Sequence, residues 1–219
     1  MRSKLARFEY NENAENVIQP GKDLFVSIKG NWKKEYFKND NPLTLELACG
    51  RGEYTIGLAK QFSDRNYVGV DIKGDRIWKG SQLANEEGLT NVGFLRTFIH
   101  NMDDFVAECE VDEIWLTFPD PRPKDRDERR RLTNERFMEL YKHILRPGGW
   151  FRFKTDNTGL FEYTLKALQL RKDIQNLTFT HNLAESELLK EHYGITTHYE
   201  QMFSEQGEVI KYLKFQFTN

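Results

Sequence analysis

The sequence predicts an α/β fold: a doubly wound, mostly parallel seven-stranded sheet with an antiparallel hairpin at one edge. Short apolar segments with strand character alternate with helical patterns between residues 44 and 170. This alternation is typical of a parallel sheet with helices on both faces. Two later strand-like segments are separated by a stretch too short for another strand–helix unit. We therefore expect those two segments to pair antiparallel at the edge.

The elements are placed from their apolar periodicity. Strands are expected over residues 44–48, 67–71, 92–95, 114–118 and 150–154, with the late pair near 177–181 and 209–217. Helices are expected over residues 54–62, 75–87, 134–145 and 159–170. Thr133 or Asn134 is the candidate cap of the third helix, which ends at Pro147-Gly148-Gly149. Residues 24–41 are expected to pack on the flank of the domain as a strand or a short helix.

The predicted domain covers residues 24–219 and follows a polar N-terminal arm, residues 1–23. The arm carries Arg2, Lys4 and Arg7 before a run rich in Asn and Glu. It is either a frayed, solvated terminus or a basic arm that becomes ordered on RNA.

The composition describes a polar globular protein of 219 residues, with 38% hydrophobic and 30% charged residues. The net charge of −2 means that any contact with nucleic acid must come from local basic patches. Cys49 and Cys109 form no CxxC pair, which favours a reducing compartment, and no metal site is expected. The sequence lacks a long apolar run and an apolar signal core, so a cytoplasmic location without membrane contact is expected. Both a monomer and a homodimer remain open.

A glycine turn lies between the first strand and the first helix. Gly50 and Gly52 are separated by one residue and allow the backbone to approach a ligand closely. Asp71 ends the second strand and is placed to accept hydrogen bonds from a ribose diol. Thr55 stands where a dinucleotide fingerprint has its third glycine, and Glu46 would repel a pyrophosphate but suit a cation. A phosphate-free, cationic nucleoside is therefore favoured, with an ordinary tight turn as the alternative.

A second group of candidates follows the third and fourth strands. Asn101 is placed to contact an adenine or, alternatively, to cap a helix over residues 103–109. Asp120 stands between two prolines and precedes six basic residues among ten. These six are Arg122, Lys124, Arg126, Arg129, Arg130 and Arg131, interleaved with three acids. The basic run, called the basic arm here, is either a grip for phosphates or a solvated helix start with internal ion pairs.

Two resemblances emerge from these residues. The segment from Glu46 to Gly52 resembles motif I of class I S-adenosylmethionine-dependent methyltransferases, which have a Rossmann-like fold, with Ala48 in place of its first glycine. The loop Phe118-Pro119-Asp120-Pro121 is followed by Phe153-Lys154-Thr155-Asp156-Asn157 and Thr197-His198-Tyr199-Glu200. Together these blocks closely resemble the bacterial tRNA (guanine-N7-)-methyltransferase family over residues 43–217.

The resemblance implies roles for individual residues. It implies S-adenosylmethionine contacts at Glu46, Asp71, Asn101 and Asp120, beside Gly50 and Gly52 of the turn, and a central catalytic role for Asp120. It implies guanosine or tRNA contacts at Lys124, Asp156, Thr197 and Glu200, and RNA contacts along residues 126–131. Asn101 departs from the Asp usual in the family, Arg122 from its Trp or Gln, and Asp127 from its His.

The implied reaction is the transfer of a methyl group from S-adenosylmethionine to N7 of a tRNA guanine in the variable loop. Guanine N7 carries a lone pair and no proton. The transfer therefore needs alignment and charge stabilisation more than a general base. Asp120 or Asp156 is suited to accept from the N1–H and N2–H₂ donors of the base. Tyr199 and Phe203 are candidates to hold an unstacked base, with core packing as the alternative.

Three other interpretations fit these residues less well. Methylation of a small molecule or a protein amine leaves the basic arm without a role. A non-catalytic RNA-binding protein leaves Glu46, Asp71 and Asp120 without a reason to be acids at strand ends. A nicotinamide dehydrogenase is disfavoured by Thr55 and Glu46.

Overall fold

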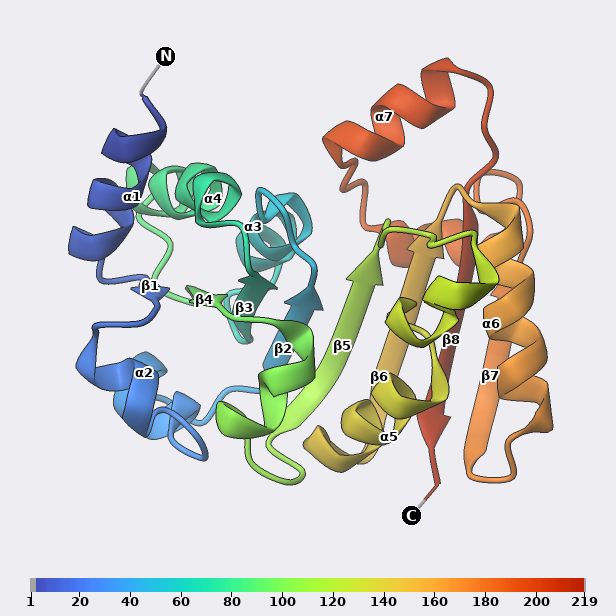
Figure 1. Cartoon of the computed structure of the whole chain (residues 1–219), viewed down its shortest axis with the longest axis horizontal. Helices are drawn as coiled ribbons and strands as arrows, with labels where there is room; N and C mark the ends of the chain where they lie inside the picture. The colour runs from blue at the N-terminus through green and yellow to red at the C-terminus, as the bar shows by residue number, and fades with distance from the viewer. Residues whose placement is uncertain (1–2, 219) are drawn as a thin grey trace.

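The computed structural model describes residues 3–218 and consists of one eight-stranded sheet covered by helices on both faces (Figure 1). Its strand order is β1-β4-β3-β2-β5-β6-β8-β7. The strands are β1 (Val17–Ile18), β2 (Leu43–Leu47), β3 (Asn66–Asp71), β4 (Val92–Arg96), β5 (Val111–Thr117), β6 (Leu145–Thr155), β7 (Ile174–Thr180) and β8 (Lys211–Phe217).

The pairing confirms the predicted fold class. The strands from β1 to β6 pair parallel, and β8 pairs antiparallel with both β6 and β7. The sheet has eight strands where seven were predicted, because β1 adds a two-residue strand beside β4. A strand of two residues is too short to show a period in the sequence. The chain reverses its direction of winding between β2 and β5, where open α/β sheets bind their ligands.

The helices divide between the faces of the sheet. They are α1 (Lys4–Asn13), α2 (Asp23–Ser27), α3 (Glu53–Gln61), α4 (Gly74–Glu86), α5 (Glu135–Ile144), α6 (Thr158–Leu170) and α7 (His198–Glu205). Shorter helical segments are η1 (Trp32–Phe37), η2 (Ile99–Asp104), η3 (Asp125–Arg130) and η4 (Glu187–His192). One buried cluster joins the sheet to η1, η2, α5 and α6, and the other joins it to α3 and α4. α7 lies above the carboxyl ends of the parallel strands (Figure 1).

Local signals explain where several elements begin. Asn134 caps α5 by accepting a hydrogen bond from the backbone N–H of Arg136 at 3.3 Å, so Asn134 rather than Thr133 is the cap. β2 alternates apolar Leu45 and Leu47, which enter the core, with Glu46, which points to the face of α3. This alternation is why a carboxylate can lie buried at the centre of the sheet.

The described part of the N-terminal segment packs against the rest of the fold, whereas a frayed terminus was one of the two alternatives that the sequence left open. α1 packs against α4, and the Asn11 side chain is buried and donates to the backbone carbonyl of Gly74 at 2.7 Å. β1 then pairs with β4. These contacts link residues far apart in the sequence, so local composition did not reveal them. Arg2 lies outside the described residues.

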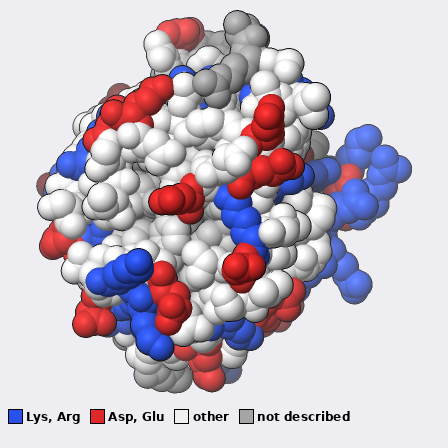
Figure 2. Space-filling view, turned by 90° about the vertical axis from the view of Figure 1, so that its left-hand side faces the viewer, with Lys and Arg blue, Asp and Glu red and all other residues white. Residues whose placement is uncertain are grey.

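Within residues 3–218, no helix is long and apolar enough to cross a membrane. Over the same range, His, Cys, Asp and Glu side chains form no group of three or more that could hold a metal ion. Lys, Arg, Asp and Glu side chains are interspersed on the face that carries α1 and α2, and a group of basic side chains projects beyond its edge (Figure 2).

Candidate active site

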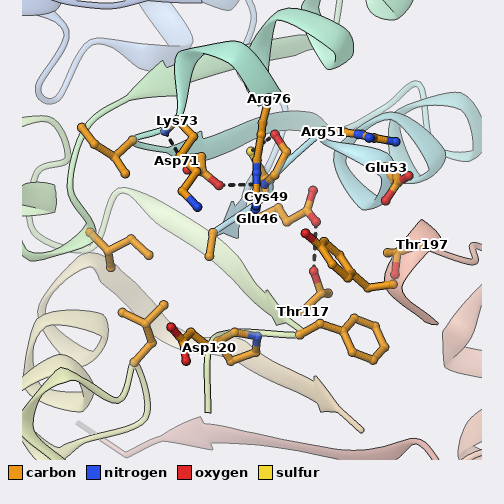
Figure 3. Close-up of a pocket in the computed structure, with 18 of the residues that line it drawn as sticks. Glu46, Cys49, Arg51, Glu53, Asp71, Lys73, Arg76, Thr117, Asp120 and Thr197 are labelled. Atoms are coloured by element: carbon orange, nitrogen blue, oxygen red, sulfur yellow. Dashed lines mark hydrogen bonds between the residues drawn. The ribbon is translucent and has the colours of Figure 1, made fainter. Parts of the chain in front are cut away.

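A large pocket opens where the winding of the sheet reverses. Its volume is about 1330 Å³, and it is lined by the carboxyl ends of β2, β3 and β5, the N-terminal parts of α3 and α4, and α7. Pockets for a single small molecule usually measure about 300–1,000 Å³, so this one has room for more than one ligand group. Figure 3 shows Glu46, Asp71, Asp120 and Thr197 arranged around it.

Glu46 lies at the floor of the pocket and is held by three hydrogen bonds. Its carboxylate accepts from the Thr55 backbone N–H at 2.8 Å, from the Thr55 hydroxyl at 2.5 Å and from the Thr117 hydroxyl at 3.0 Å. Burial raises the pKa of Glu46 to about 7, and the hydrogen bonds from Thr55 and Thr117 oppose that rise. Thr55, which the sequence marked only as a missing glycine, is therefore the residue that orients this acid.

The glycine turn has a backbone that L-residues rarely adopt. Ala48, Gly50 and Gly52 all have positive φ, at 57°, 57° and 69°. A Cβ on Gly52 would lie 2.5 Å from the ring of Phe94, whereas a Cβ on Gly50 would meet nothing within 4 Å. Gly52 is needed for close packing, and Gly50 leaves open space on the pocket side. Ala48 occupies the left-handed region at a cost of about 1 kcal/mol.

Asp71 is fixed at the end of β3. Its two carboxylate oxygens accept backbone hydrogen bonds from Gly50 at 3.0 Å and from Lys73 at 2.8 Å. Each oxygen retains a further lone pair for a ligand. The acid is therefore oriented by the same turn that forms the pocket wall.

Two exposed apolar side chains that were not predicted from the sequence line the pocket beside Asp71. Ile72 is 38% exposed and Phe98 is 51% exposed, and the Phe98 ring stacks on His100 at 5.1 Å. Asn101, the predicted adenine contact, is half-buried on η2 and is not among the described residues that line the pocket. An apolar residue directly after a strand-end acid was the signal that could have identified Ile72.

Asp120 lies across the pocket from Asp71 (Figure 3). Its side chain is 62% exposed and forms an ion pair with the Arg122 guanidinium at 3.1 Å. It also accepts a hydrogen bond from the Arg122 backbone N–H at 3.2 Å. Phe118 and Arg122 have φ values of 50° and 46°, so left-handed residues stand on both sides of Asp120. Such strain in non-glycine residues occurs where the surrounding structure holds a functional loop.

The N-terminal end of α7 closes one side of the pocket. Thr197 lines it and caps α7 by accepting from the backbone N–H of Glu200 at 3.0 Å. The backbone N–H of His198 donates to Glu53 of α3 at 3.1 Å. Tyr199 and Phe203 also line the pocket, with their rings stacked at 6.4 Å. Tyr199 is 40% exposed, so it is not a core residue.

Glu200 points away from the pocket into a buried ion pair. Both of its carboxylate oxygens accept from the Lys154 ammonium at 2.9 Å, and one is 2.9 Å from Nε2 of His192. Burial lowers the pKa of Lys154 to about 8, against the opposing effect of Glu200. Burial disfavours the charged form of Glu200, but hydrogen bonds from His192 and Lys154 leave its pKa below the usual value. Glu200 is not among the described residues that line the pocket, so a direct substrate contact is not seen.

Asp156 follows β6 and lines the pocket from the side of α6. It is half-buried, and this burial raises its pKa. A backbone hydrogen bond to the carboxyl and the positive charge of Lys211 partly offset that rise in pKa. Lys211 also donates to the backbone carbonyl of Asp156 at 2.7 Å.

The residues of the basic arm are placed differently from one another. Arg130 lines the pocket and pairs with Asp127 at 3.2 Å. Arg131 is half-buried, donates to the backbone carbonyl of Arg122 at 3.1 Å and lies 4.4 Å from the ring centroid of Tyr163. The remaining cations, Lys124, Arg126 and Arg129, are exposed and form no ion pair with residues 3–218.

The strand order, the glycine turn and the strand-end acids define the class of protein, a class I methyltransferase. The family model described as "Putative methyltransferase" matches residues 40–213. A tRNA (guanine-N(7)-)-methyltransferase of Cytophaga hutchinsonii is 51% identical, over 99% of this chain and 98% of the relative. Another relative with this name, from Christiangramia forsetii, is 44% identical over 98% of this chain and 97% of the relative. The chain belongs to the tRNA (guanine-N(7)-)-methyltransferase family.

Solved structures resemble this chain in fold. A 16S rRNA methyltransferase, KamB, matches with a TM-score of 0.62 at 13% identity, over 85% of this chain and 92% of that one. A 30S ribosomal A1408 methyltransferase from an uncultured bacterium matches with a TM-score of 0.59 at 15% identity, over 87% of this chain and 95% of that one. At these identities the likeness supports the sheet architecture alone.

Proposed function

We propose that the protein transfers the methyl group of S-adenosylmethionine to N7 of a guanine in tRNA. The products are 7-methylguanosine in tRNA and S-adenosylhomocysteine. The observation that carries the proposal is the convergence of Glu46, Asp71, Asp120 and Asp156 on one large pocket beside the basic arm. The 51% identity to a relative named for this reaction supports the choice of substrate.

The residues at the β2–β3 side of the pocket fit S-adenosylmethionine. Glu46, when ionised, supplies a negative charge in a fixed position for a cationic ligand, and Asp71 supplies acceptors for ribose hydroxyls. Ile72 and Phe98 offer exposed apolar surface for an adenine ring, a role we assign to them in preference to Asn101. When bound, the cofactor supplies an electrophilic methyl group on a sulfonium.

The residues at the opposite side fit a guanine base. Asp120 and Asp156 accept hydrogen bonds from N1–H and N2–H₂, and Tyr199 and Phe203 provide rings on which an unstacked base rests. The N7 lone pair forms the new N–C bond, the electrons of the broken S–C bond return to sulfur, and no proton leaves the base. The acids therefore act by positioning the base and stabilising its new positive charge.

Arg122 has a defined part in this proposal. It neutralises Asp120 in the free protein, at 3.1 Å, and must leave that carboxylate when guanine binds. Four later residues of the basic arm contact tRNA phosphates: Lys124, Arg126, Arg129 and Arg130. Arg131 supports the loop through Arg122 and Tyr163 instead.

The proposal has two further parts. The methylated guanine lies in the variable loop of the tRNA, and the protein works in the cytoplasm. The first rests on the family resemblance. The second agrees with two free cysteines, one buried and one exposed, which suit a reducing compartment.

The test is incubation of an unmodified tRNA transcript with methyl-labelled S-adenosylmethionine, followed by nucleoside analysis. We expect label in 7-methylguanosine, and strand cleavage at the modified base should place it in the variable loop. Label in another nucleoside, or no transfer from a protein that binds the cofactor, contradicts the proposed reaction. Cleavage elsewhere in the tRNA contradicts only the assigned position.

A further inference from the structure

A second group of cations lies on the pocket, formed by Arg7 of α1 with Lys73, Arg76 and Lys79 at the start of α4. We call these four residues the α4 rim. All four line the pocket, with Asp75 as an acidic neighbour. Lys73, Arg76 and Lys79 follow each other at intervals of three residues, which places them on adjoining parts of one helix face.

Two members of the α4 rim lie against one aromatic ring. The Arg7 guanidinium lies 5.2 Å from the ring centroid of Trp78, and the Lys79 ammonium lies 6.0 Å from it. Within residues 3–218, Lys73, Arg76 and Lys79 form no ion pair, whereas Arg122 and Arg130 on the other side are paired. The Lys79 ammonium thus lies near a ring without an ion pair to residues 3–218, and it is available to an anion.

The proposed cofactor does not account for these cations. S-adenosylmethionine carries no phosphate and is itself a cation. Its single carboxylate needs at most one basic partner, and Arg51 of the glycine turn already lines the pocket. The α4 rim therefore adds positive charge beyond what the cofactor requires.

A polynucleotide accounts for them. A nucleotide held in the pocket is joined to phosphates on both its 5′ and 3′ sides, so anionic backbone leaves the pocket in two directions. Figure 3 shows Lys73 and Arg76 on the side of the pocket opposite Asp120, from which the basic arm continues. The arm can meet the backbone on one side only.

We propose that the α4 rim binds the phosphate backbone of the tRNA on the side of the target guanine opposite the basic arm. This inference rests on the proposed function and assigns it a second contact surface. It also gives the N-terminal helix a role, because α1 brings Arg7 to the rim.

The test compares two double variants that each remove two positive charges. Arg76→Ala/Lys79→Ala alters the rim, and Lys166→Ala/Lys172→Ala alters exposed residues on and after α6 as the matched control. Binding of tRNA is measured without turnover, in S-adenosylhomocysteine, over a series of NaCl concentrations. The rim variant should bind tRNA about tenfold more weakly than the wild type. In a plot of log K for tRNA against log salt concentration, the magnitude of its slope should be smaller by about 1 to 2.

The control variant should bind tRNA as the wild type does, and both should keep wild-type cofactor affinity. The charge-preserving variant Arg76→Lys/Lys79→Arg should retain the salt slope. A rim variant with the slope of the control overturns the proposal, and so does loss of cofactor affinity with tRNA binding intact. Failure of the proposed function is seen separately, as absence of 7-methylguanosine in the wild-type reaction.

Discussion

The ammonium of Lys154 lies 2.9 Å from both carboxylate oxygens of Glu200, and the two side chains are 0% and 8% exposed. This pair joins the end of β6 to the first turn of α7, which carries Thr197 and Tyr199 to the pocket. A contact deep in the protein thus holds the wall of the proposed guanine site.

Removing one partner of this pair should be costly. Lys154→Met leaves Glu200 buried, with His192 as the one remaining partner of its carboxylate among residues 3–218. We expect a loss of about 3 kcal/mol in unfolding free energy, measured in urea. The double variant Lys154→Met/Glu200→Leu should recover part of that loss because no buried charge remains. A loss below about 1 kcal/mol in the single variant contradicts a structural role for the pair.

Cofactor affinity should depend on Glu46. Its pKa of about 7 means that the free protein holds this proton at pH 6 and has lost most of it by pH 7.5. Because a cationic ligand favours the ionised acid, affinity for S-adenosylmethionine should rise several-fold over that interval. Calorimetry should show this rise in the wild type and not in Glu46→Gln. Equal pH dependence in both proteins contradicts a contact between Glu46 and the cofactor.

The unfolding free energy of the cofactor-free protein should fall as pH rises, whereas cofactor affinity should rise. The folded-state pKa lies above the ordinary value of 4.5, so the folded state retains the proton between pH 4.5 and about 7. The contribution of Glu46 to the unfolding free energy is therefore fully present below pH 4.5, and it is lost as pH rises through that window. The difference in unfolding free energy between wild type and Glu46→Gln, followed against pH, measures it.

The glycine turn allows a paired test of backbone strain. Gly52→Ala should lower the unfolding free energy by about 2 kcal/mol, because its Cβ meets the Phe94 ring at 2.5 Å and φ is positive. Ala48→Gly relieves strain at a φ of 57° and should leave stability unchanged or raise it by up to about 1 kcal/mol. Thermal unfolding of both variants checks the contrast. Equal losses would mean that crowding by Phe94 is not the cause.

Asp120 should matter for transfer more than for cofactor binding. Asp120→Ala should reduce kcat with tRNA by about a hundredfold or more while S-adenosylmethionine affinity stays within about threefold. Its exposed side chain faces Arg122 and lies across the pocket from Asp71, which supports this separation. Single-turnover assays with calorimetry distinguish the two effects. Loss of cofactor affinity in parallel with kcat makes Asp120 mainly a cofactor residue.

The arginines of the basic arm should fall into two groups. Arg126→Ala/Arg129→Ala removes exposed, unpaired charges and should raise the KM for tRNA and reduce its salt dependence. Arg131→Ala removes the contacts to Arg122 and Tyr163, so it should lower stability by about 1 kcal/mol with little change in salt slope. Both variants are measured in two ways: the salt dependence of the KM for tRNA, and thermal unfolding. An equal salt effect from Arg131→Ala contradicts this division.

The fold class could be predicted from the sequence, and so could the acids that line the pocket, because both depend on local patterns. Strand–helix alternation predicted the parallel sheet, and Glu46 near the end of one strand, Asp71 at the end of the next and Asp120 shortly after a third were expected at one edge of it. The contacts that the neighbours of these acids make depend on tertiary packing and could not be predicted. Thr55 became a donor to Glu46, Glu200 turned from the pocket to Lys154, and Arg7 reached α4 because these contacts join segments distant in the chain. Such pairings depend on packing between elements, which no local period records.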